Sequence, residues 1–127
     1  MTRKLSSRIA SLFLILHGSI EIVGLLFINS MPNTMINFGG LTGSLLEQNA
    51  QVIGVFGAIW GISRLIAATG AWSQRKWAML LGIILSLVTM VAAITIIPAG
   101  VMDTFLALPV LILLLYAWFG NEAKVVE

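Results

Sequence analysis

The chain of 127 residues contains no cysteine, which excludes a disulfide, a thiolate metal site and a thiol nucleophile. Charged residues are scarce as well. They make up 9% of the chain, whereas a soluble domain carries about 25%. Because so few charges cannot keep a surface in water, we expect lipid to cover most of this protein.

Apolar sequence is abundant instead. Hydrophobic residues make up 59% of the chain, and the mean hydropathy is +1.04. They gather in four long runs, which predict helices over about 7–28, 45–71, 76–97 and 104–119. The first three can each cross a ~30 Å hydrocarbon layer at ~1.5 Å per residue. The prediction is an all-α, polytopic membrane protein, with four transmembrane helices in an up-down bundle and one domain over 1–127.

Local signals set the expected helix ends. Pro32 ends the first helix, because the residue before a proline is disfavoured in a helix. After a loop of about 20 residues, whose role the residues do not indicate, Ser44-Leu45-Leu46-Glu47 has the form of a capping box. Asp103 is the expected N-cap of the fourth helix. Pro109 should kink that helix.

Positive charge lies on one side of the apolar runs. The other side carries only Glu47 and Asp103, so the positive-inside rule predicts a protein of the cell (inner or plasma) membrane with both termini in the cytoplasm. We interpret the net charge of +2 as an orientation signal, and expect no nucleic-acid partner. The basic residues at the flanks are Arg3, Lys4, Arg8, Arg75, Lys76 and Lys124.

Three ionisable residues lie inside the apolar runs. His17 and Glu21 are spaced i, i+4 and share a helix face, and Arg64 lies at a similar depth in the second run. An isolated charge at the centre of a membrane helix costs about 2.5–3.5 kcal/mol. We therefore predict a Glu21–Arg64 ion pair with His17 hydrogen-bonded beside it. This cluster is either a ligand or proton site or a structural pair that fixes helix register.

Small residues indicate where helices pack closely. Gly24 continues the face of Glu21, and Gly57 and Gly61 form a GxxxG element on the face of Arg64. These three glycines are the predicted packing positions. In the third run, Ser86 and Thr89 are expected to bond back to their own helix.

The residues indicate no cofactor, no metal and no catalytic group. His17 and Glu21 supply two metal ligands, whereas catalytic zinc takes three from the protein. Haem would need a second axial ligand, such as His17 of a second copy. The expected partner is the lipid bilayer, with a second copy of the chain or another membrane subunit left open.

The segment Gly70-Ala71-Trp72-Ser73-Gln74-Arg75-Lys76-Trp77-Ala78, followed by an apolar helix, resembles a pattern in small prokaryotic four-helix membrane proteins of unknown function. This resemblance covers the second and third helices and implies a fold, not an activity. The size and Glu21 are also similar to small multidrug resistance transporters, in which a first-helix glutamate binds cations in exchange for protons. The chain departs from them in Arg64, its long first loop and its charge bias.

Three classes of function remain open from the sequence. The first is a non-catalytic accessory or scaffold protein, or one that binds a small or lipidic ligand at His17, Glu21 and Arg64. The second is a small proton-coupled transporter that uses Glu21. The third is a membrane enzyme or redox subunit that uses His17.

Overall fold

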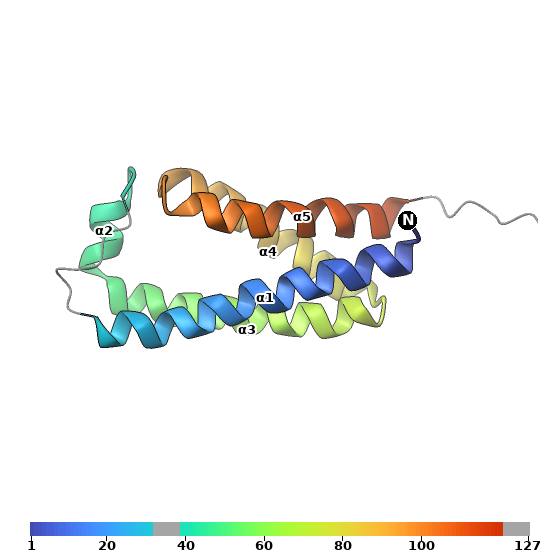
Figure 1. Cartoon of the computed structure of the whole chain (residues 1–127), viewed down its shortest axis with the longest axis horizontal. Helices are drawn as coiled ribbons and strands as arrows, with labels where there is room; N and C mark the ends of the chain where they lie inside the picture. The colour runs from blue at the N-terminus through green and yellow to red at the C-terminus, as the bar shows by residue number, and fades with distance from the viewer. Residues whose placement is uncertain (32–38, 121–127) are drawn as a thin grey trace, which may run out of the picture.

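The computed structural model describes residues 1–31 and 39–120, which contain five α-helices and no strand (Figure 1). All of these helices except α2 are long and apolar enough to cross a membrane, as the hydrophobic runs predicted. The helices are α1 (Arg3–Ser30), α2 (Gly43–Gln48), α3 (Ala50–Trp72), α4 (Lys76–Thr95) and α5 (Gly100–Phe119).

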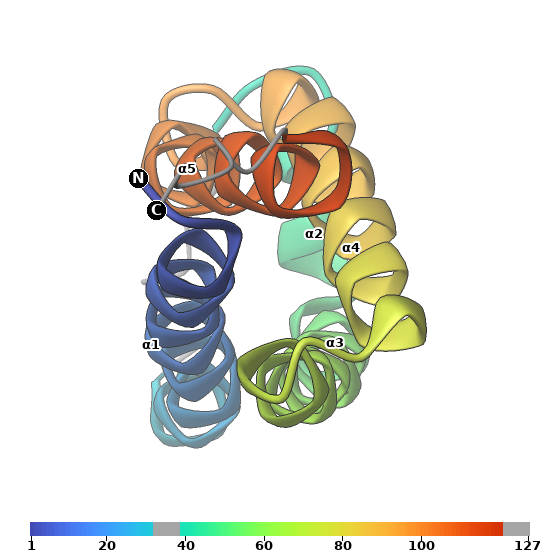
Figure 2. The ribbon, with the colours of Figure 1, turned by 90° about the vertical axis from the view of Figure 1, so that its right-hand side faces the viewer.

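The four long helices run alternately up and down and form the corners of a square when seen end-on (Figures 1 and 2). Each packs against two others, so that α1 contacts α3, α3 contacts α4, α4 contacts α5, and α5 returns to α1. The short helix α2 stands across the end of the bundle opposite the N-terminus. The first and last long helices are therefore direct neighbours.

The predicted helix over 45–71 is in fact two helices, because the chain breaks at Asn49, between α2 and α3. Ser44 lies inside α2, and the N-cap residue is Thr42, so the predicted capping box is wrong. The Thr42 hydroxyl instead donates to the Thr95 hydroxyl at 3.1 Å, and its backbone N–H donates to the Thr95 carbonyl at 3.3 Å. These bonds tie the segment before α2 to the end of α4.

Helix α5 begins at Gly100, earlier than expected, so Asp103 lies in its first turn and is not its N-cap. Backbone bonds replace a side-chain cap here, because the N–H of Gly100 donates to the Ile96 carbonyl at 3.0 Å. The helix is continuous through Pro109. The consequence is that the Asp103 carboxylate is available to contacts between helices.

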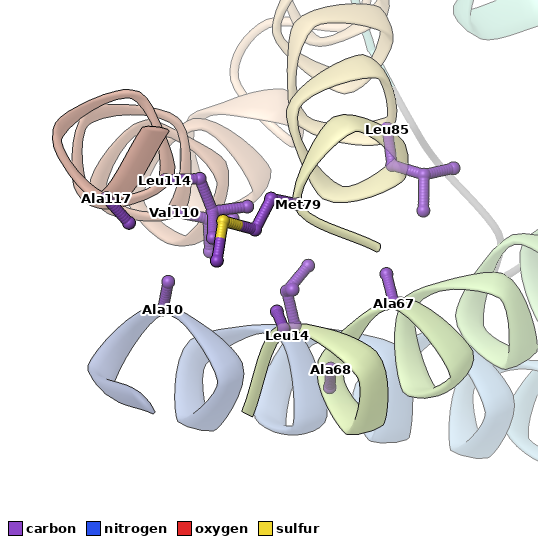
Figure 3. Packing of buried hydrophobic residues seen from close by; sticks show 10 residues of the cluster. Ala10, Leu14, Ala67, Ala68, Met79, Leu85, Val110, Leu114 and Ala117 are labelled. Carbon is purple, nitrogen blue, oxygen red and sulfur yellow. The ribbon is translucent and has the colours of Figure 1, made fainter. Parts of the chain in front are cut away.

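Small and medium-sized side chains form the core, whereas many large apolar side chains lie on the outer surface. Figure 3 shows Leu14 of α1 beside Met79 of α4 and Leu114 of α5. Alanines from α1, α3 and α5 fill the remaining positions, namely Ala10, Ala67, Ala68, Ala71 and Ala117. Helices in lipid pack through small residues in this way, because association there gains little from burying apolar surface.

Helices α1 and α3 approach each other closely at Gly18 and Gly61. A Cβ atom added to either glycine would lie 2.6 Å from the carbonyl oxygen of the other. The predicted packing role of Gly61 is therefore seen, but with Gly18 as its partner. The prediction for Gly24 and Gly57 is wrong, since an added Cβ would meet nothing within 4 Å at either position.

Candidate functional site

Arg64 connects three helices inside the bundle. Its side chain is fully buried, and Nε donates to Glu21 Oε2 of α1 at 2.7 Å, which is the ion pair predicted from the sequence. Its Nη2 donates to the hydroxyl of Thr89 on α4. Thr89 therefore does not bond back to its own helix as expected. Gly18 makes room for the arginine, because a Cβ there would lie 3.1 Å from Arg64 Cβ.

His17 is completely buried between two carboxylates. Its Nε2 lies 3.7 Å from Glu21 Oε1 and 3.4 Å from Asp103 Oδ1, and neither ring nitrogen makes a hydrogen bond to any residue that the structure describes. The predicted hydrogen bond of His17 is thus wrong. The reason is that Glu21 directs its other oxygen to Arg64, which holds the carboxylate just outside hydrogen-bond distance of the imidazole.

The antiparallel register of α1 and α5 brings Asp103 to this cluster. The Arg3 Nε donates to the Ala117 carbonyl at 2.7 Å near one end of the pair. His17 follows Arg3 along α1 by the same number of residues by which Asp103 precedes Ala117 on α5, so the two pairs lie in one register. The sequence did not predict that Asp103 belongs to this cluster. As the expected N-cap of its helix, Asp103 was placed at the helix end and away from His17.

A cavity of about 280 Å³ lies beside the two carboxylates. Glu21, Thr89 and Asp103 border it, and their carboxylates differ in exposure, with 18% of the Glu21 side chain and 44% of the Asp103 side chain accessible. The other walls are apolar and include the aromatic rings of Phe56 and Trp60. Gly57 also lines this cavity, and no described residue lies within 4 Å of a Cβ atom added there, so its missing side chain leaves space.

The charges of the cluster do not balance when His17 is neutral. Glu21 and Asp103 carry two negative charges against the single positive charge of Arg64, which leaves a net charge of −1. An uncompensated charge is costly inside a membrane. The cluster can therefore hold a further positive charge next to Asp103.

Two further buried polar atoms lack hydrogen-bond partners among the described residues. They are Arg64 Nη1 and the hydroxyl of Ser86, both buried. Ser86 was expected to bond back to its helix, and it does not. Within residues 1–31 and 39–120, no three His, Asp or Glu side chains are placed to hold a metal ion.

The comparisons with known proteins add no relative: no family model matches the chain, and no curated protein or solved structure is significantly similar to it.

Proposed function

We propose that this chain is a single-domain, multi-pass protein of the cell membrane that binds a small organic cation in the cavity between Glu21 and Asp103. The charge bias of the loops supports an orientation with both termini in the cytoplasm. The four apolar helices support the membrane location. The protein then acts as a small-ligand-binding membrane protein without catalytic chemistry.

The observation that carries this proposal is that the two carboxylates have different ion-pair partners. Glu21 is held by Arg64 at 2.7 Å, whereas the ion-pair contact of Asp103 within the described residues is with the imidazole of His17, at 3.4 Å. Asp103 is also the more exposed of the two and borders the cavity. A cation placed there would pair with Asp103 and restore neutrality.

The walls of the cavity favour an organic cation with an apolar group. Phe56 and Trp60 supply aromatic surface, and rings attract cations at their faces as well as apolar groups. A small hydrated metal ion would gain little from such walls. Proton-coupled transport through Glu21 is a second candidate, favoured by the burial of His17 between the two carboxylates.

The fluorescence of Trp60 provides the test. Purified protein in bicelles is titrated with benzyltrimethylammonium and, as a control of opposite charge, with benzenesulfonate. We expect only the cation to change the tryptophan signal, the change to vanish in Trp60→Phe, and affinity to fall about tenfold in Asp103→Asn, since a lost charge-assisted contact is worth roughly 1.4 kcal/mol.

Glu47→Gln is the matched control, because it removes one carboxylate outside the cavity. Equal responses to both probes, or an unchanged affinity in Asp103→Asn, would contradict the proposal and favour an accessory or scaffold role. The same titration in weak buffer separates the two candidates, because proton-coupled exchange releases a proton as the cation binds.

A further inference from the structure

A second hollow is lined by residues near the N-terminus and the turn between α3 and α4. Figure 1 shows this end of the bundle opposite α2. The volume of the hollow is about 320 Å³, and α1, α4 and α5 all contribute to its walls. The residues that line it are Arg3, Gln74, Lys76, Met79, Ala117 and Trp118. It shares no residue with the cavity at Asp103.

The position of Arg3 in this hollow is fixed by two hydrogen bonds. Its Nε donates to the Ala117 carbonyl at 2.7 Å and its Nη2 to the Trp118 carbonyl at 2.9 Å. These are carbonyls of the last turn of α5, which a helix leaves without partners of its own. The guanidinium is thus held in place, and Arg3 is half-buried while it lines the hollow.

Lys76 adds a second positive charge to the same hollow. It is the first residue of α4 and is exposed. In the part of the chain that the structure describes, no carboxylate lies within ion-pair distance of Arg3 or Lys76. Among residues 1–31 and 39–120, two cations therefore line one concavity with no carboxylate in its walls.

The remaining walls of the hollow are partly apolar, which favours a lipid over a fully hydrated ligand. Met79 is buried and Trp118 is half-buried, so one side of the hollow is apolar, while the Gln74 amide adds a polar group. In a chain whose long helices span the membrane, this end lies at headgroup level, where tryptophan is favoured. Basic pockets between membrane helices bind anionic headgroups.

We propose that the hollow between Arg3 and Lys76 binds the phosphate group of an anionic phospholipid headgroup. The phosphate accepts from both cations, and the start of the glyceride lies against Met79 and Trp118. This proposal depends on the helices spanning a membrane, but not on the cation-binding cavity.

The test counts lipids retained by the full chain. Delipidated protein is returned to mixed vesicles with equal amounts of phosphatidylglycerol and phosphatidylcholine, extracted, and analysed by native mass spectrometry. Lys76→Ala removes a charge from the hollow, and Lys4→Ala removes one from the same end of the bundle outside the hollow. We expect preferential retention of phosphatidylglycerol, weakened about fivefold by Lys76→Ala and little by Lys4→Ala.

Three results decide the outcome. Equal retention of the two lipids, or equal losses in both variants, would overturn the proposal, because diffuse attraction would then explain the binding. A parallel titration with inorganic phosphate identifies the source of the phosphate. If phosphate alone binds with the same dependence on Lys76 and phosphatidylglycerol does not, the hollow is a soluble-anion site and the lipid assignment fails.

Discussion

Arg64 shows how one residue can hold a membrane bundle together. Its guanidinium reaches Glu21 on α1 and Thr89 on α4 while its backbone belongs to α3. Inside lipid, each of these partners would otherwise be a costly polar group. The residue therefore acts chiefly on stability, in contrast to Asp103, which lies 3.4 Å from the His17 imidazole and borders the cavity.

A double-mutant cycle separates these two roles. We expect Glu21→Gln and Arg64→Met each to lower the free energy of unfolding in bicelles by about 3 kcal/mol, because each leaves a buried partner unpaired. The double variant should recover most of this loss. Asp103→Asn serves as the comparison and should leave the free energy of unfolding unchanged or higher. Additive losses in the double variant would show that the pair is not coupled.

At the scale of the element, the close contact of α1 with α3 depends on glycine at two facing positions. Gly18 and Gly61 place backbone against backbone, and Arg64 reaches Glu21 from one turn beyond Gly61. Any side chain at Gly61 would push the two helices apart and lengthen the ion pair.

Gly61→Ala is accordingly expected to lower the free energy of unfolding by about 1–3 kcal/mol, because overpacking displaces a close helix contact. Gly57→Ala is the matched control on the same helix, where nothing lies within 4 Å of an added Cβ. Since alanine favours a helix over glycine by about 1 kcal/mol, this control should be neutral or stabilising. If Gly61→Ala and Gly57→Ala lower the free energy of unfolding equally in an SDS titration, the result would argue against the Gly18–Gly61 contact.

Features that depend on local sequence could be predicted, whereas features that depend on how the helices align could not. The four apolar helices depend on local composition, and the Glu21–Arg64 pair depends on depth and on the cost of an isolated charge, so both could be predicted. Asp103 and Gly18 could not, because their roles depend on the register of α1 against α5 and on which face of α1 meets α3. The GxxxG spacing indicated the right helix, but Gly57 lines the cavity instead.

At the scale of the whole molecule, the absence of cysteine makes the proposed orientation testable without background labelling. Ser73→Cys lies in the turn at the basic end, and Ser44→Cys lies in α2 at the other end; both serines are exposed. In intact cells, a membrane-impermeant maleimide should label Ser44→Cys alone. It should label both variants after permeabilisation. The reverse pattern would place the termini outside the cytoplasm.

The ring of four helices also imposes an order on its own assembly during synthesis. The carbonyls that accept from Arg3 belong to Ala117 and Trp118, and the Tyr116 hydroxyl donates to the carbonyl of Met1. The partners of Met1 and Arg3 thus belong to α5, which leaves the ribosome after α1, α3 and α4. Until then α1 can pair with α3, but the square stays open on the side of α5. A nascent chain stalled before α5 therefore presents an unfilled edge to the insertion machinery.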